Sequence, residues 1–300
     1  MQKWLLIIKA NFLLATIIPL FFGIAWSLQF VNIADLHISL LFALIIGTIS
    51  CHIAANTFND YFDWQSGADQ VNTNYIMSIS GGSRAIELGF ITEQTLFKVA
   101  LSFLTIAAIC GFYLTLIKGP LIILLGIVGA FAIYFYTAPP IRLIARCGLG
   151  EFFIFLCFGP IFIMGVIYVL TTRLDFVSFF IGIPIGLLIT SILVINEYPD
   201  LAADRIVGKK NLAVVLGEKW LPWCIILLTL LSYIFTIFGI IINILPKTFL
   251  LAMLTLPLAI YEIKLVLNLT KSREYVVKAC FNNLKLYACF GATFIIASII

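Results

Sequence analysis

Long runs of apolar residues alternate with short polar segments along almost the whole chain of 300 residues. A helix that spans the hydrocarbon core of a bilayer needs about 20 predominantly apolar residues. The pattern therefore predicts nine membrane-spanning helices. They are residues 5–28, 36–58, 95–117, 120–138, 150–171, 176–195, 219–243, 247–267 and 277–300.

The composition supports a membrane environment. Hydrophobic residues make up 63% of the chain and charged residues 11%, whereas soluble domains carry roughly 25% charged residues. Water cannot solvate so apolar a chain, so we expect an all-α membrane protein surrounded by the lipid bilayer. The net charge of +4 is small and spread among apolar runs, which argues against nucleic acid as a partner.

The basic residues fall mostly on one side of the predicted membrane. Nine spans divide the connecting segments into two sides, and one side carries fourteen of the 18 lysines and arginines. Basic residues remain in the cytoplasm, so we predict a cell (plasma) membrane protein with a cytoplasmic N-terminus. The fourteen residues are Lys3, Lys9, Arg84, Lys98, Arg142, Arg146, Arg205, Lys209, Lys210, Lys219, Lys264, Lys271, Arg273 and Lys278.

Two similar acidic motifs end the second and the sixth predicted spans, on this same side. They read NDYFD at residues 59–63 and NEYPD at residues 196–200. The motifs are four helices apart, so we interpret them as a weak internal repeat of a four-helix unit. The alternative is that they are solvated loop carboxylates with helix-capping asparagines.

Spacing indicates how the motif side chains are arranged. Residues four apart lie on one helical face, so Asn196, Asp200 and Asp204 are expected to form one stripe about two turns long. Asn59 and Asp63 should form a matching stripe, with Asn56 and Asp60 beside it. Pro199 lacks a backbone N–H and is expected to kink the sixth helix.

The clustered oxygens predict a magnesium and diphosphate site. Mg²⁺ prefers oxygen ligands and is typically bound by one or two carboxylates together with substrate phosphates. Catalytic roles are predicted for Asp60, Asp63, Asp200 and Asp204, and the candidate metal ligands are Asn59, Asp63, Asp69, Asn196, Asp200 and Asp204. Candidate diphosphate-binding residues are Asn56, Arg84, Tyr136, Arg142, Lys209 and Lys210. For Arg142, a rigid turn with a cytoplasmic anchor is an equally good interpretation.

Four patches of the chain resemble the UbiA superfamily of intramembrane prenyltransferases, especially its naphthoate branch. They are NDYFDWQSGAD (59–69), GGSRAIELG (81–89), YTAPPIRLIARCGLGE (136–151) and NEYPDLAADRIVGKKNLAVVLG (196–217). The resemblance implies one domain over residues 1–300. It also implies nine helices around a central cavity, capped on the cytoplasmic side by the two acidic motifs.

The same resemblance implies a reaction. The enzyme would transfer a polyprenyl group from an isoprenyl diphosphate to an aromatic acceptor, 1,4-dihydroxy-2-naphthoate, in menaquinone-type quinone biosynthesis. Mg²⁺ would neutralise the departing diphosphate. Aromatic side chains would line the substrate cavity, and Tyr61, Tyr198 and Phe152 are candidates.

The chain departs from the commonest family pattern at two positions. Gly67 stands where the usual first motif has its last aspartate, and Asp69 follows two residues later. This variant resembles the naphthoate branch. If Asp69 reaches the cluster, the helix must end near Gly67, whose missing Cβ allows the chain to turn. Asn11 stands where many relatives have an arginine in the first helix.

Other functions remain open at this stage. Within the superfamily, the acceptor could be 4-hydroxybenzoate or a glycerol phosphate ether lipid, or the reaction could be terpene cyclisation. A cation-coupled transporter is the alternative from another class. It predicts broken helices with carboxylates near the bilayer midplane, whereas the acidic residues here lie at helix ends.

Overall fold

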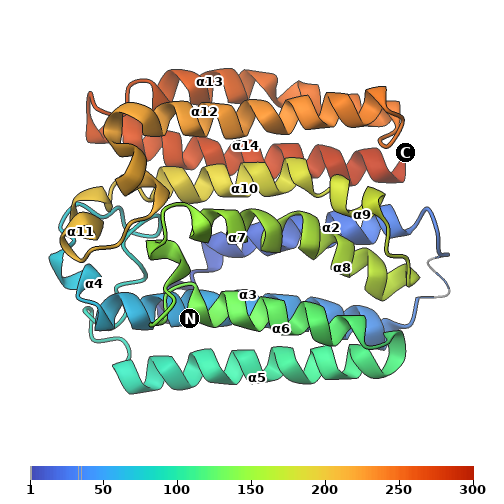
Figure 1. Cartoon of the computed structure of the whole chain (residues 1–300), viewed down its shortest axis with the longest axis horizontal. Coiled ribbons are helices and arrows are strands. Elements are labelled where there is room, and N and C mark those ends of the chain that lie inside the picture. Colours follow the sequence, from blue (N-terminus) through green and yellow to red (C-terminus); the bar gives the residue numbers. More distant parts are fainter. Residues whose placement is uncertain (1, 33, 35) are drawn as a thin grey trace. The chain divides into compact units, whose positions relative to one another are not determined.

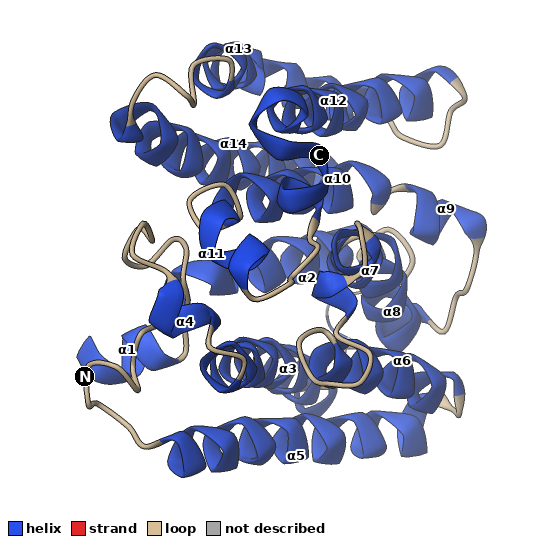
Figure 2. Ribbon diagram, turned by 60° about the vertical axis from the view of Figure 1, so that its left-hand side comes forward, coloured by secondary structure: helices blue, strands red, loops and turns tan. Residues whose placement is uncertain are grey.

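The computed structural model describes residues 2–32, 34 and 36–300, and within them every regular element is a helix (Figures 1 and 2). The expectation of an all-α protein is therefore confirmed. The elements are α1 (Gln2–Ile7), η1 (Ala10–Leu13), α2 (Leu14–Ser27), α3 (Ile38–Gln65), α4 (Ala68–Val71), α5 (Glu93–Lys118), α6 (Leu121–Phe135), η3 (Leu143–Ala145), α7 (Leu149–Phe158), α8 (Pro160–Thr171), α9 (Phe176–Phe180), α10 (Ile183–Asn196), α11 (Leu201–Ile206), α12 (Leu212–Ile241), η4 (Lys247–Thr255), α13 (Leu256–Val266) and α14 (Arg273–Ile299).

Eight helical segments in the described part of the chain are long and apolar enough to cross a membrane. The protein is therefore an integral multi-pass membrane protein. The remaining predicted span, 120–138, corresponds to α6, which has only 15 residues. The eight segments are Ala10–Ser27, Ile38–Gln65, Glu93–Lys118, Leu149–Thr171, Phe176–Asn196, Leu212–Ile241, Lys247–Val266 and Arg273–Ile299.

The chain forms two compact units. The first comprises Met1–Thr16, His37–Gly150 and Pro199–Val215. The second comprises Ile17–Leu36, Glu151–Tyr198 and Leu216–Ile300. The single domain expected over residues 1–300 stays a prediction.

The first unit is built around α3, which runs beside α5 and α6 (Figure 1). Ala54 and Ala100 are fully buried between α3 and α5. Their small side chains allow the two helices to approach closely. One turn further along α3, the Phe58 ring meets Phe97 and Tyr134 edge-on, with centroids 5.7 and 5.4 Å away. This packing fixes the end of α3 that carries the first acidic motif.

The second unit packs α14 against α10, α13 and η4. Phe22, Phe249 and Phe294 form a fully buried aromatic cluster, whose ring centroids lie 4.9 to 6.2 Å apart. Edge-to-face arrangements of this kind stabilise aromatic pairs beyond their buried area.

The helix that carries the second motif ends earlier than a continuous polar stripe requires. Helix α10 ends at Asn196, and α11 begins after Asp200. The predicted stripe through Asn196, Asp200 and Asp204 on one kinked helix is therefore wrong. Pro199 explains the break, because a proline disfavours helical geometry in the residue before it as well as removing its own N–H.

The end of α3 agrees with the sequence. Helix α3 stops at Gln65, and Gly67 adopts a left-handed conformation with φ of 80° before α4 begins. This turn leads the chain to Asp69, which is buried on α4. The predicted helix end near Gly67 is confirmed.

We expect Gly67→Ala to lower the free energy of unfolding by about 1 kcal/mol, because a left-handed conformation is costly for a residue with a Cβ. No atom lies within 4 Å of the new methyl group, so the loss would come from the backbone alone. Thermal unfolding in detergent measures it. Gly111→Ala in α5 also meets open space and should leave stability unchanged or raise it. Equal effects of the two substitutions would contradict this account.

Candidate active site

Aspartates from both acidic motifs gather in the first unit. Asp60 and Asp63 occupy the last turns of α3, and Asp69 lies on α4. Asp200 precedes α11 and Asp204 lies within it. Helices α4 and α11 pack against each other, so the ends of both motifs meet. We call these five residues the aspartate cluster. All are buried except Asp200, which is half-buried.

Lys209 joins the two motifs. Its Nζ lies 3.2 Å from both carboxylate oxygens of Asp63 and 3.6 Å from Oδ1 of Asp204. Burial lowers the pKa of Lys209, but the charges of Asp63, Asp204 and Asp200 outweigh it and hold that pKa above its ordinary value. Lys209 was predicted to bind diphosphate. Here its ammonium group binds the aspartates.

Lys9 is a second cation of the cluster, and sequence reasoning missed it as a site residue. Its Nζ lies 2.6 Å from Oδ1 of Asp60 and donates a hydrogen bond of 3.0 Å to Oδ1 of Asn59. The predicted span 5–28 placed Lys9 inside one helix. Instead, α1 ends before it and Lys9 takes a left-handed conformation, with φ of 50°. The missing arginine at Asn11 was the available signal, because a lysine stands two residues earlier.

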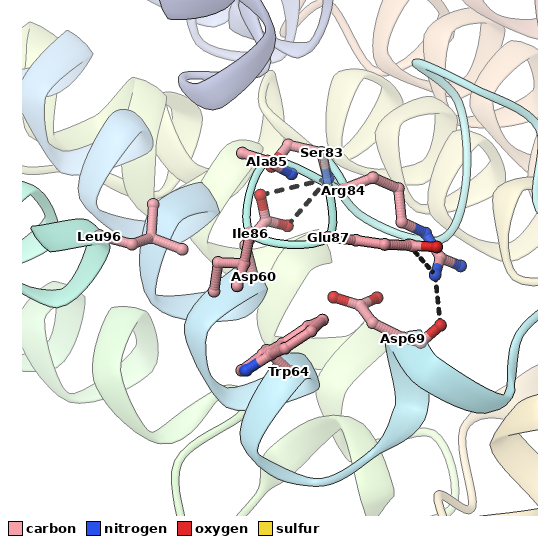
Figure 3. Close-up of a pocket in the computed structure, with 9 residues that line it drawn as sticks. All are labelled: Asp60, Trp64, Asp69, Ser83, Arg84, Ala85, Ile86, Glu87 and Leu96. Carbon is pink, nitrogen blue, oxygen red and sulfur yellow. Dashed lines mark hydrogen bonds and ion pairs between the residues drawn. The ribbon is translucent and has the colours of Figure 1, made fainter. Parts of the chain in front are cut away.

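A loop over residues 72–84 connects the motifs through hydrogen bonds. The Gly81 N–H donates to Oδ2 of Asp200 at 2.8 Å, and Nδ2 of Asn72 donates to Oδ1 of the same carboxylate at 2.6 Å. The Ser83 N–H donates to both oxygens of Asp60 at 3.3 and 3.2 Å (Figure 3). One loop therefore holds a carboxylate of each motif.

Gly82 lies between two carboxylates of the first motif. A Cβ at this position would lie 2.9 Å from Oδ1 of Asp60 and 3.4 Å from Oδ1 of Asp69. Its φ of 74° is also left-handed. The narrow pocket of Figure 3 has Asp60 and Asp69 in its wall, facing the segment that begins at Ser83. Only glycine allows the loop to approach the cluster this closely.

Arg84 stabilises the loop itself. Its guanidinium group stacks on the Tyr75 ring, 3.9 Å from the centroid. It donates hydrogen bonds to the backbone carbonyls of Asp69 and Asn72, and to the Glu87 carboxylate at 3.0 Å. The donors expected to bind diphosphate are thus directed at the protein in this structure. Diphosphate binding by Arg84 stays a prediction.

The structure also places the other predicted residues of the first unit. Nδ2 of Asn56 donates to the Ile8 carbonyl at 3.4 Å. Asn59 donates to Oδ2 of Asp63 at 3.1 Å, and the Tyr61 ring packs 4.9 Å from that of Phe97. Tyr136 caps α6, Arg142 precedes η3 with φ of 47°, and the exposed Lys210 accepts a hydrogen bond from Cys147 through its carbonyl.

Three predicted residues belong to the second unit. Asn196 ends α10 with its Oδ1 buried, and Tyr198 is half-buried in the turn that follows. Phe152 on α7 is 53% exposed. The predicted roles of these three residues stay predictions.

Carboxyl groups of the aspartate cluster disfavour one another's ionisation. Burial, with the charges of Asp63 and Asp60, raises the pKa of Asp69 to about 8. Burial, with the charges of Asp63 and Asp200, raises the pKa of Asp204 to about 6. Burial also raises the pKa of Asp200. A cation bound among these carboxyl groups would stabilise their ionised form.

The chemistry of the donors suits a hard divalent cation, although their present arrangement is set by lysines. Carboxylate and amide oxygens are the ligands that Mg²⁺ takes, usually only one or two of them with substrate phosphates. Among the described residues, no three acidic, histidine or cysteine side chains converge closely enough to hold a metal ion. Asp63 and Asp204 are instead turned toward the shared Lys209.

The fold and the site define this protein as a multi-pass helical membrane protein with a buried aspartate cluster. Comparison with known proteins gives its family. The model of the UbiA prenyltransferase family matches residues 16–284. The chain belongs to this family.

Two curated relatives illustrate the sequence similarity. The 1,4-dihydroxy-2-naphthoate octaprenyltransferase of Bacillus subtilis (strain 168) is 28% identical over 211 residues, which are 70% of this chain and 65% of that protein. UbiA prenyltransferase domain-containing protein 1 of Dictyostelium discoideum is 30% identical over 215 residues, covering 70% of this chain and 63% of that protein. The matched region thus spans slightly less than two thirds of either relative.

Solved structures share the fold. A UbiA homolog from Aeropyrum pernix K1, in an apo structure, superposes with a TM-score of 0.71 at 14% identity, covering 94% of this chain and 97% of that one. A UbiA homolog from Archaeoglobus fulgidus bound to DMAPP and Mg²⁺ gives a TM-score of 0.60 at 13% identity, covering 98% and 99%.

We expect Gly82→Ala to disturb the aspartate cluster, because its methyl group would crowd Asp60 and Asp69. Gly89→Ala is the matched control, since Gly89 has a similar φ of 66° but meets nothing within 4 Å. The left-handed backbone should lower the free energy of unfolding by about 1 kcal/mol in both variants. Gly82→Ala should lower it further. Thermal unfolding of the two purified variants measures the difference. The same loss in both would show that the loop does not press on the carboxylates.

Proposed function

We propose that this protein transfers a polyprenyl group from an isoprenyl diphosphate to 1,4-dihydroxy-2-naphthoate and releases diphosphate. The observation that carries the proposal is the buried aspartate cluster, in which both motifs contribute carboxylates around two lysines. Such a cluster favours a bound cation, and the metal ion that accompanies a diphosphate supplies one. Membership of the UbiA prenyltransferase family supports the same reaction.

The naphthoate acceptor is supported by two features of the sequence. The Bacillus subtilis and Mycobacterium tuberculosis relatives are both named 1,4-dihydroxy-2-naphthoate octaprenyltransferases, at 28% and 29% identity. The first acidic motif also has the Gly67 and Asp69 variant that resembles the naphthoate branch. These features favour a naphthoate over 4-hydroxybenzoate or an ether lipid.

The residues of the cluster have separable tasks in the proposed reaction. Asp63, Asp200 and Asp204 would hold the metal, with Asp69 reaching it from α4. Bound Mg²⁺ supplies charge neutralisation for the diphosphate oxygens. Lys9 and Lys209 add donors for the charge that develops on the leaving group. The bond from the prenyl carbon to diphosphate oxygen would break with its electron pair on the diphosphate, and the acceptor ring would supply the pair for the new carbon–carbon bond. The attacked ring carbon would then lose its hydrogen as a proton, or its carboxylate as carbon dioxide, and the ring would become aromatic again.

The aromatic residues beside the first motif suit the prenyl side of this reaction. A developing allylic cation is stabilised by the faces of aromatic rings. Tyr61 lies on α3 one residue from Asp60, and its ring packs with Phe62 and Phe97. Tyr61 is therefore the cavity residue of the first unit that we favour, with Tyr198 and Phe152 as the candidates of the second unit.

Replacement of a metal-binding aspartate is expected to abolish prenyl transfer. Asp63→Asn or Asp200→Asn should lower turnover by about 100-fold or more, the usual cost of losing a strong electrostatic contribution. The assay combines purified protein, Mg²⁺, geranylgeranyl or farnesyl diphosphate and 1,4-dihydroxy-2-naphthoate.

Asp175→Asn is the matched control for this assay. Asp175 caps α9 by accepting a hydrogen bond from the Ser178 N–H at 2.8 Å, and asparagine caps helices equally well. This variant should keep its turnover. Near wild-type rates in folded Asp63→Asn or Asp200→Asn would remove these residues from the site. Absence of product from the wild type with every prenyl diphosphate would refute the proposed function.

The acidic motifs should face the cytoplasm, because the predicted loops and adjoining helix ends on their side carry fourteen lysines and arginines. A reporter fused after residue 75 measures the orientation in intact cells, and a reporter in the turn around Arg173 provides the opposite-side control. Labelling of the fusion after residue 75 from outside the cell would reverse the proposed orientation.

A further inference from the structure

Two ammonium groups occupy the places between the carboxylates where a cation is most favourable. Lys9 forms an ion pair with Asp60 and donates a hydrogen bond to Asn59, both in the first motif. Lys209 lies between Asp63 and Asp204, and so spans both motifs. The side chains of Lys9 and Lys209 are only 12% and 10% exposed. Both lysines therefore depend on the aspartates for their neutralisation.

This arrangement opposes the entry of a bare divalent cation. A metal ion that binds Asp63 and Asp204 together must displace Lys209 from both. The displaced ammonium group would then lie buried without a partner, which is strongly unfavourable. The ammonium group would also repel the arriving ion. The carboxylates are consequently spaced for lysine, in agreement with the lack of a three-residue metal cluster in the described chain.

Diphosphate removes this obstacle, because its negatively charged oxygens can form ion pairs with the displaced lysines. Lys209 is fixed at its backbone by a 2.8 Å hydrogen bond from its N–H to the Asp204 carbonyl, so only its side chain needs to turn. The anion would then pair with lysine on one side and with the metal on the other. Every charge in the buried site keeps a partner during the exchange.

We propose that Lys9 and Lys209 make this site bind a divalent cation and a diphosphate as a pair, and exclude the free cation. The proposal rests on the proposed function and deepens it. The lysines act as internal competitors for the metal and as ligands of the diphosphate. A protein in a cytoplasm rich in free Mg²⁺ thus keeps the aspartate cluster paired with its own lysines until the prenyl diphosphate arrives.

The test is a thermal unfolding experiment on the full chain in detergent, with Mn²⁺ alone, inorganic diphosphate alone, and both. A ligand that binds only the folded protein raises its unfolding temperature in proportion to occupancy. For the wild type, we expect a large rise with the pair and almost none with either component. The affinity for Mn²⁺ should improve by about 10-fold or more when diphosphate is present, a typical size for coupled binding.

Removal of one lysine charge should separate the two ligands. Lys209→Met keeps the apolar stem but lacks the ammonium group, so Mn²⁺ alone should stabilise it, and diphosphate should add little. Lys209→Arg retains a cation and should behave like the wild type. Lys98→Met on the exposed surface of α5 is the matched control and should also behave like the wild type. Lys9→Met should show the same change as Lys209→Met, and it carries the test if Lys209→Met does not fold.

Each outcome has one meaning. Equal stabilisation of the wild type by Mn²⁺ alone and by the pair would overturn the proposal and leave the proposed function intact. Wild-type behaviour of folded Lys209→Met and Lys9→Met would overturn it too. No stabilisation of any variant by the pair would overturn both the proposal and the metal–diphosphate site on which it rests.

Discussion

Mutual repulsion among buried carboxylates is the constraint on which the rest of the first unit depends. Asp60, Asp63, Asp69 and Asp204 are each no more than 9% exposed, and charges close together in a low-dielectric interior repel strongly. The folded chain offsets this repulsion with two lysines and with N–H donors of residues 72–84. Each of these groups comes from a segment without regular helix: the break before η1, the loop before α5 and the stretch after α11.

The surrounding helices provide rigidity, and their ends provide the chemistry. Aromatic and alanine packing along α3 and α5 holds the first motif in place, while Gly67 and Pro199 end the helices where polar side chains must diverge. Irregular backbone can be buried here because its polar groups find hydrogen-bond partners inside the protein. The proposed metal–diphosphate pair would therefore bind among irregular connections supported by packed helices.

Sequence alone predicted the parts of this protein that depend on local patterns. Hydrophobic run length located the spanning helices, and the glycine at position 67 located the end of α3. The stripe through Asn196 and Asp204 was wrong because helical spacing was applied across Pro199. Lys9 was missed because its contact with Asp60 joins positions far apart in the chain, through a helix break that no residue type announces. Arg84 was identified as a basic neighbour of the motif, but its stacking on Tyr75 depends on the loop conformation.

The hydrogen bonds from Gly81 and Ser83 come from the main chain, not from side chains. Alanine substitution of Ser83 therefore leaves its contact with Asp60 in place, since every residue except proline retains the N–H donor. The Ser83 side chain has a separate partner, because its Oγ accepts a hydrogen bond of 3.3 Å from the Ala85 N–H. The contact with Asp60 depends on the path of the backbone. The neighbouring glycines permit that path, and they are the sign of it in the sequence.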